Sequence, residues 1–261
     1  MTRSTRGALA VLALLAASWP MHGQAIDPVL ARARQQQAPL LDTLRDLVAI
    51  ESGSRDMAGL NRVSELIAAR LRALGGEVQL VAPADVVRFD DTPPETGRSV
   101  VATFTGTGTR KILLLAHMDT VYAQGMSARQ PFRVDGDRAY GLGIADDKQG
   151  VALILHTLEI LRALNVRDYG TLTVLINGDE ELSSPGSRSL ITRLGREHDV
   201  VFSCESSGNG DGDNVLLATT GNVHVRPSSR TSGCRGSACT RTTPSTSSSA
   251  RSNRASSCCH A

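Results

Sequence analysis

The sequence contains no cluster of basic residues interleaved with aromatic ones. Aromatic residues make up 3% of the 261-residue chain, and the formal net charge is only +2. Nucleic-acid-binding domains carry a basic patch or stripe, so the composition does not favour a nucleic-acid partner. Hydrophobic and charged residues account for 41% and 21% of the chain. These proportions are typical of an ordinary globular protein and not of a disordered one.

Long apolar runs are also absent. A transmembrane helix needs about 20 consecutive apolar residues, and no segment reaches that length. Residues 8–19 form a shorter apolar run, which follows two arginines and precedes the small residues Gly23 and Ala25. This order, with small residues at positions −3 and −1, is typical of a secretory signal peptide. We therefore predict that residues 1–25 are a signal peptide and that the mature protein is periplasmic or secreted, with no membrane attachment after cleavage.

Cysteine is nearly absent before residue 226. Cys204 stands alone there, and the other four cysteines occupy positions 234, 239, 258 and 259. A disulfide framework joins structured elements of small secreted domains. We do not expect such a framework here.

Residues 226–261 lack Leu, Ile, Val, Phe, Met, Asp and Glu altogether. A segment without such apolar residues has nothing to bury, so we predict that it is disordered. The composition changes abruptly after Val225, inside a strand-like stretch, which favours a shifted reading frame over a natural low-complexity tail. Translating the other two frames of the coding DNA after codon 225 tests this interpretation, because one of them should continue the apolar pattern.

Helix-like and strand-like segments alternate between residues 38 and 225. Apolar residues recur at helical spacing in three segments, residues 40–48, 60–74 and 150–164. Four segments read as strands, residues 99–104, 111–116, 171–176 and 200–203. Apolar strands that alternate with helices are typical of a parallel sheet covered on each side. We predict an α/β fold with a mainly parallel sheet and helices on both faces.

His117 and Asp119 come directly after the apolar segment 111–116. Open α/β folds place their sites beyond the carboxyl ends of parallel strands. A histidine can bind a metal through one ring nitrogen while a nearby carboxylate accepts a hydrogen bond from the other and orients the ring. The alternative is a surface histidine beside a turn aspartate, and this pair alone does not decide between them.

The sequence GLGIADDKQG, residues 141–150, leads into an apolar helix and contains Asp146. Glycines let the backbone approach a ligand closely, and one carboxylate can bridge two metal ions about 3.5–4 Å apart. The alternative is an aspartate that caps the following helix. A phosphate-binding loop is disfavoured, because the spacing differs from G-x-x-x-x-G-K-[ST].

Acidic residues also follow the last two predicted strands. Asp179, Glu180 and Glu181 come after the third strand, and Glu205 comes after the fourth. Three adjacent carboxylates repel one another, so a cation nearby would offset their charge, although an isolated acidic triplet is more often a solvated turn. Because a parallel sheet collects the carboxyl ends of its strands along one edge, we expect Glu180, Glu181 and Glu205, together with Asp146, to lie beside His117. Mixed nitrogen and oxygen ligands suit zinc, with cobalt or manganese as substitutes.

These motifs and their spacing resemble the M20 metallopeptidase family, and within it the periplasmic glutamate carboxypeptidases. The resemblance rests on LLLAHMDTVY, YGLGIADDKQG, INGDEELSSPGSR and a later glutamate, and it covers about residues 38–225. It implies that residues 26–225 are the N-terminal part of a phosphorylase/hydrolase-like catalytic domain with two zinc ions. The implied reaction is hydrolysis of a C-terminal amino acid from a small peptide or N-acyl amide by a metal-bridged water.

The resemblance also implies a role for each site residue. His117 and Glu205 would bind one zinc ion. Asp146 would bridge both ions, and Glu181 would bind the other. Glu180 would be the general base, and the aspartate two residues after the histidine would orient its ring.

Two features of that family have no counterpart in the sequence. There is no candidate for the last zinc-binding histidine, because His260 lies in the predicted disordered tail and His224 matches no family role. The smaller domain through which family members form homodimers is absent as well. We therefore expect an incomplete second zinc site and a chain that is unstable, and inactive or impaired as an enzyme.

Two other functions stay open. A deacylase of N-acyl amino acids has the same fold and the same kind of site, and only its substrates distinguish it. A non-catalytic, metal-binding secreted fragment would share the ligands but show no turnover.

Overall fold

The main feature of the computed structural model, which describes residues 27–206, is a five-stranded sheet. Its strands are β1 Glu77–Val81, β2 Ser99–Thr105, β3 Lys111–His117, β6 Thr171–Asn177 and β7 Val200–Ser203, in the order β1, β2, β6, β3, β7. All four predicted strands are present, with ends that agree to within one residue, whereas β1 was not predicted. The predicted signal peptide and the segment 226–261 lie outside the described residues.

Most strands of this sheet run in one direction. β3 pairs in parallel with β6 on one side and with β7 on the other. β2 runs antiparallel to both of its neighbours, β1 and β6. Within the five-stranded sheet, β2 is therefore the reversed strand and the other four point the same way. The predicted α/β class with a mainly parallel sheet is confirmed.

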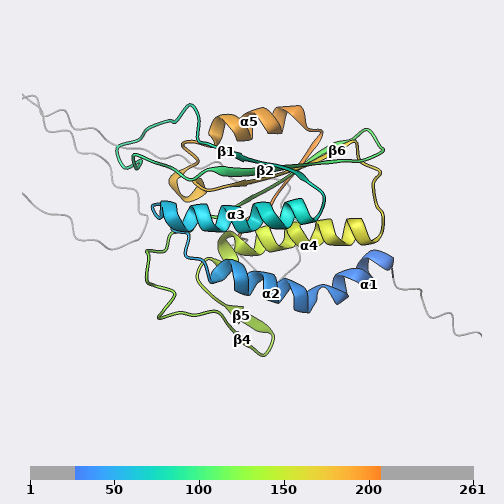
Figure 1. Ribbon diagram of the computed structural model, residues 1–261, viewed down its shortest axis with the longest axis horizontal. Helices are drawn as coiled ribbons and strands as arrows, with labels where there is room; N and C mark the ends of the chain where they lie inside the picture. Colours follow the sequence, from blue (N-terminus) through green and yellow to red (C-terminus); the bar gives the residue numbers. More distant parts are fainter. Residues whose placement is uncertain (1–26, 207–261) are drawn as a thin grey trace, which may run out of the picture. The chain divides into compact units, whose positions relative to one another are not determined.

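Helices cover both faces of the sheet (Figure 1). The helices are α1 Pro28–Gln35, α2 Gln37–Val48, α3 Met57–Ala73, α4 Gln149–Ala163 and α5 Arg188–Glu197. α3 and α4 pack on one face, α2 packs against α4, and α5 covers the opposite face. None of the described helices has the length and apolar character needed to cross a bilayer.

The sheet is buried unequally on its two faces. The larger core lies under α2, α3 and α4 and includes Leu47, Leu71, Leu155 and Ile176. A smaller cluster under α5 contains Leu113, Leu175 and Leu194. Residues 172–177 of the central strand β6 are all buried, which explains why its sequence is mostly apolar and does not alternate with exposed polar residues.

Helix α3 shows how the local sequence sets an element. Its fully buried side chains recur every three or four residues, at Leu60, Val63, Ile67 and Leu71. Asp56 caps the first turn by accepting a hydrogen bond from the backbone N–H of Gly59. Gly75, at φ 95°, has a left-handed conformation that favours glycine and ends the helix.

A two-stranded hairpin precedes the glycine-rich loop. β4 (Arg133–Asp135) pairs with β5 (Arg138–Tyr140) in an antiparallel ladder separate from the main sheet. The hairpin was not predicted, because each strand is only three residues long. It ends directly before Gly141, where the loop that carries Asp146 begins.

Candidate metal centre

His117 is the last residue of β3, and only 1% of it is exposed. In the parallel ladder it pairs with Asn177, the last residue of β6, while β7 lies on the other side of β3. The loops that follow these three neighbouring strands therefore begin at one edge of the sheet. Glu180 follows β6 and Glu205 follows β7, so both lie near His117, as the strand-end argument predicted.

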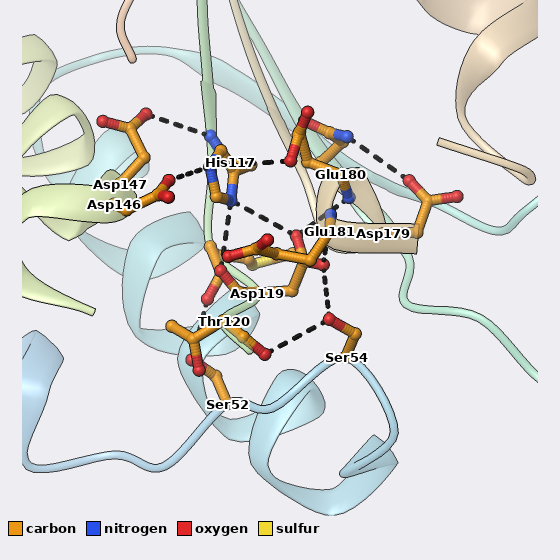
Figure 2. A network of polar contacts seen from close by, with 12 residues as sticks. Ser52, Ser54, His117, Asp119, Thr120, Asp146, Asp147, Asp179, Glu180 and Glu181 are labelled. Atoms are coloured by element: carbon orange, nitrogen blue, oxygen red, sulfur yellow. Dashed lines mark hydrogen bonds and ion pairs between the residues drawn. The ribbon is translucent and has the colours of Figure 1, made fainter. Parts of the chain in front are cut away.

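Carboxylates surround the Nε2 atom of His117. Asp146 Oδ1 lies 2.9 Å from this nitrogen and Glu180 Oε2 lies 4.0 Å from it (Figure 2). Glu205 Oε2 is 3.8 Å away. These three acidic side chains are about half exposed, whereas the imidazole is buried. The arrangement is a solvent-accessible acidic cluster around one fixed nitrogen.

Two sets of three residues could each hold a metal ion. His117, Glu180 and Glu205 form one set. His117, Asp146 and Glu181 form the other, and within each set the ligand atoms all lie within 4.8 Å of one another. The five residues expected to bind metal or act as the base are therefore together in space. Their grouping differs from the implied roles in two respects. The expected base, Glu180, belongs to one of the sets, and Asp146, the expected bridging ligand, belongs to only one of them.

Asp119 lies beside the other ring nitrogen and is fully buried. His117 Nδ1 is 3.1 Å from the carbonyl oxygen of Asp119 and 3.4 Å from its Oδ1. The Asp119 carboxylate also accepts hydrogen bonds from the backbone N–H groups of Glu180 at 3.0 Å and Glu181 at 3.1 Å. The hydroxyl of Ser54 donates to it at 2.8 Å. One aspartate thus contacts the imidazole and also holds the backbone of the acidic pair, a second role that the sequence motif did not indicate.

The capping role considered for Asp146 belongs instead to its neighbour. Asp147 is fully buried, and its Oδ1 accepts a hydrogen bond from the backbone N–H of Gly150 at the start of α4, at 3.2 Å. Its Oδ2 accepts from the backbone N–H of His117 at 3.4 Å. Burial raises the pKa of Asp147 to about 7. Asp147 thus bonds to the first turn of α4, whereas Asp146 faces the imidazole.

Lys148 connects the same loop to helix α2. Its buried Nζ donates to the carbonyl oxygens of Leu47 at 2.9 Å and Ile50 at 2.7 Å. Burial lowers the pKa of this ammonium group to about 8. These bonds satisfy carbonyls near the end of α2 and fix the loop that carries Asp146. A lone lysine at the start of an apolar helix was the only sign of this contact in the sequence.

The pKa shifts within the cluster show that nearby positive charge would stabilise it. Burial, with Asp146 next in importance, raises the pKa of Glu181 to about 7. Burial also raises the pKa of Glu180, although His117 opposes the shift. Burial lowers the pKa of His117, but the hydrogen bond and charge of Asp119 and the other nearby carboxylates outweigh it and raise the value to about 10. Each shift favours a bound proton over a bare anionic cluster. A divalent cation would supply the same positive charge, and one imidazole nitrogen with several carboxylate oxygens suits zinc.

The comparison with known families agrees with this chemistry. The model of peptidase family M20/M25/M40 matches residues 113–245, just over half of the chain. The chain belongs to this family. The matched range contains every candidate site residue and ends in the part of the chain that lies outside the described residues.

Several M20 relatives and related structures resemble the chain. Carboxypeptidase G2 from Pseudomonas sp. (strain RS-16) is 42% identical over 218 residues, which cover 83% of this chain and 50% of the relative. Acetylornithine deacetylase from Erwinia tasmaniensis is 28% identical over 151 residues, 57% of this chain and 38% of the relative. The structure of the dipeptidase Dug1p from Saccharomyces cerevisiae has a TM-score of 0.59 at 16% identity, covers 68% of this chain and 40% of Dug1p, and shows a shared fold. The chain spans half the length of these relatives or less.

The remaining described histidines of this M20 chain make other contacts. His156 lies among the helices, with Nε2 2.8 Å from Thr43 Oγ1 and Nδ1 2.7 Å from Gln36 Oε1. His198 Nε2 is 2.8 Å from the hydroxyl of Thr173 in β6. Within residues 27–206, His117 therefore supplies the only imidazole of the candidate centre. His224 and His260, considered above for the missing ligand, lie outside the described residues.

Proposed function

We propose that this chain is the metal-binding catalytic part of a zinc exopeptidase that hydrolyses the amide bond before a C-terminal amino acid. The observation that carries the proposal is the buried imidazole of His117 facing carboxylates from three separate loops. Membership of the M20 family and 42% identity to a carboxypeptidase support the reaction class. A small peptide or an N-acyl amino acid is the proposed substrate.

The proposed zinc ligands are the members of this cluster. His117 and Glu205 would hold one ion, Glu181 would hold a second, and Asp146 would contribute to both. Zinc bound here lowers the pKa of a coordinated water and polarises the carbonyl of the scissile amide. We expect the second ion to bind weakly, because His117 is the only imidazole that residues 27–206 contribute to the cluster.

Glu180 is the proposed general base. Its carboxylate is about half exposed, so substrate and water can reach it, and its Oε2 faces the imidazole. It accepts a proton from the attacking water and delivers it to the nitrogen of the leaving amine. The Asp119 carboxylate accepts a hydrogen bond from the backbone N–H of Glu180 and so fixes the position of the Glu180 backbone.

The test compares Glu180→Gln with wild type in zinc-supplemented hydrolysis of N-acyl-glutamate substrates. Loss of the base should lower kcat by about 10²–10⁴-fold, while zinc binding, measured by competition with a chelator, falls much less. The control is Glu77→Gln, because Glu77 is exposed on β1, at the sheet edge opposite β7. A wild-type chain that binds zinc but shows no zinc-dependent turnover would overturn the catalytic part and favour the metal-binding fragment instead.

A deacylase of N-acyl amino acids is the second candidate, favoured by the 28% identity to acetylornithine deacetylase. Both reactions break an amide bond with the same residues, so the site geometry does not separate them. Turnover of short peptides and of N-acetyl and N-succinyl amino acids, compared at equal concentration, distinguishes the two. Preference for the short acyl groups would replace the carboxypeptidase proposal.

We also propose that the protein is exported, on the evidence of the N-terminal sequence. Fractionation of cells that express the chain with a C-terminal tag should place it in the periplasm or medium, with residues 1–25 removed. Retention of the full-length chain in the cytoplasm would contradict the proposal.

A further inference from the structure

Asp179 is a fully buried carboxylate that the proposed chemistry does not use. Its Oδ2 accepts hydrogen bonds from the backbone N–H groups of Gly186 at 2.6 Å and Ser187 at 3.0 Å. Its Oδ1 accepts from the hydroxyl of Ser187 at 2.5 Å and from the side-chain amide of Asn177 at 3.3 Å. Each carboxylate oxygen of Asp179 therefore accepts two hydrogen bonds. Within residues 27–206, no lysine, arginine or histidine forms an ion pair with this side chain, so hydrogen bonds alone compensate its burial.

The same residue closes the turn that contains the acidic pair. The carbonyl oxygen of Asp179 accepts from the backbone N–H groups of Leu182 at 3.3 Å and Ser184 at 2.9 Å. Ser183 and Ser184 have φ values of 66° and 51°, which reverse the chain direction before α5 begins. Asp179 therefore bonds to the end of the loop, at Gly186 and Ser187, through its side chain. It bonds to the turn, at Leu182 and Ser184, through its backbone carbonyl. Glu180 and Glu181 are the two residues enclosed between these contacts.

Asp119 holds the acidic pair from the other side. It accepts hydrogen bonds from the backbone N–H groups of Glu180 and Glu181, as described above. Asp119 comes from the loop after β3, whereas Asp179 precedes the pair in its own loop (Figure 2). The pair is thus fixed by one carboxylate across the sheet edge and by a second within the loop. Without the second, the loop after Glu181 would lose the contacts that return it to α5.

We propose that Asp179 is a positioning residue, which sets the direction of Glu180 and Glu181 toward His117 by bonding the segment from Gly186 to Ser187. The inference rests on the proposed function, because it concerns how Glu180, the proposed base, and Glu181, a proposed zinc ligand, are held in position. Asp179 itself contacts neither the imidazole nor the open face of the cluster. Its role is carried through the backbone of its own loop.

Three substitutions grade the loss of these bonds. Asp179→Ala removes both side-chain acceptors and keeps the backbone carbonyl. Asp179→Asn keeps one oxygen, which can still accept from the two backbone N–H groups of Gly186 and Ser187, so it should rescue part of the function. Ser187→Ala removes one hydroxyl donor and leaves the backbone contacts in place. The expected order of effect is therefore alanine at 179 first, asparagine at 179 second and alanine at 187 last.

The first readout is the affinity of the full chain for zinc, measured by competition with a chelator. Loss of groups that orient metal ligands typically costs about 10–100-fold in affinity, and we expect Asp179→Ala to fall in this range. Leu194→Ala is the control. Leu194 lies on α5 and belongs to the apolar cluster with Leu113 and Leu175, so its loss should lower the melting temperature without lowering zinc affinity. Zinc affinity within twofold of wild type in both Asp179 variants, or an equal loss in the control, would overturn the inference.

The second readout needs no metal. Hydrogen exchange at the backbone amides of Gly186 and Ser187 should accelerate in Asp179→Ala, and less in Asp179→Asn, while the control leaves their relative protection unchanged. Unchanged protection in both variants would overturn the inference even if zinc does not bind. A wild-type chain that fails to bind zinc would overturn the proposed function, and the exchange data would still decide what Asp179 does. If the alanine variant does not fold, the asparagine and Ser187→Ala variants supply the comparison.

Discussion

Replacing Asp119 by alanine should weaken the fold as well as the site. The carboxylate is fully buried and receives the backbone N–H groups of Glu180 and Glu181 and the hydroxyl of Ser54. The hydroxyl has a second acceptor, the carbonyl oxygen of Thr120 at 3.2 Å, so it does not lose its only partner. By contrast, the backbone N–H groups of Glu180 and Glu181 lose the only hydrogen-bond partner that they have within residues 27–206. A fully buried donor left without a partner costs about 1–3 kcal/mol. The two N–H groups are partly buried, so the expected loss in the free energy of unfolding is at most about 2–6 kcal/mol.

Urea unfolding of the metal-free chain measures this loss. Trp19, the only tryptophan, lies in the predicted signal peptide, so far-UV circular dichroism is the appropriate signal. With a urea m-value of about 2 kcal/mol per M, the midpoint of Asp119→Ala should fall by at most about 1–3 M. The midpoint of Asp119→Asn should fall less, because one side-chain oxygen remains as an acceptor.

The matched control is an exposed aspartate. Asp135 lies in the β4–β5 hairpin with most of its side chain in solvent, and its contact with Arg133 is 3.8 Å long. Asp135→Ala should leave the midpoint unchanged, as exposed ion pairs contribute little. An Asp119→Ala chain that unfolds at the wild-type midpoint would refute the claim that Asp119 holds the acidic pair.

Two further predictions concern loops on either side of the site. The N–H groups of Gly125 and Ser127 hold the pKa of Glu51 at about 2, below its ordinary value of 4.5. The stability that Glu51 contributes is therefore complete above pH 4.5 and is lost as the pH falls through 2. The urea midpoints of wild type and Glu51→Gln should differ at pH 6 and converge between pH 4.5 and 2, and a constant difference would contradict this account. Gly97→Ala should lower the melting temperature by several degrees, because its Cβ would lie 2.1 Å from a backbone carbonyl oxygen and overpacking costs about 1–3 kcal/mol; Gly195→Ala, which meets open space on α5, should not.

The location of the site was predictable because it follows from local patterns. The apolar run of β3 identifies a buried strand, and His117 is the residue at its end. The same argument applied to β6 and β7 leads to Glu180 and Glu205. Parallel pairing then brings the three strand ends together whatever the details of packing. Residue type and spacing were therefore enough to name the members of the cluster.

The contacts that hold the cluster could not be predicted in the same way. Lys148 bonds to carbonyl oxygens about 100 residues earlier in the chain, at the end of α2. Asp119 bonds to backbone groups about 60 residues later. Such contacts depend on how helices and loops pack against the sheet, and sequence periodicity carries no information about that packing. The hairpin before Gly141 was not predictable for a different reason, because strands of three residues are too short to show alternating hydrophobicity.

The amino-acid sequence by itself determined the class of fold, the strands that end at the site and the chemical groups placed there. It did so because side-chain periodicity and strand-end position are local properties of the chain. Only the tertiary structure decided that β2 runs against the other strands, that Asp147 and not Asp146 caps α4, and that Asp179 is buried with four donors. The direction of β2 depends on which distant segments pair after folding, whereas the contacts of Asp147 and Asp179 depend on loop conformations that side-chain periodicity does not specify. The sequence therefore identified the residues of the cluster, and the fold determined what holds them in place.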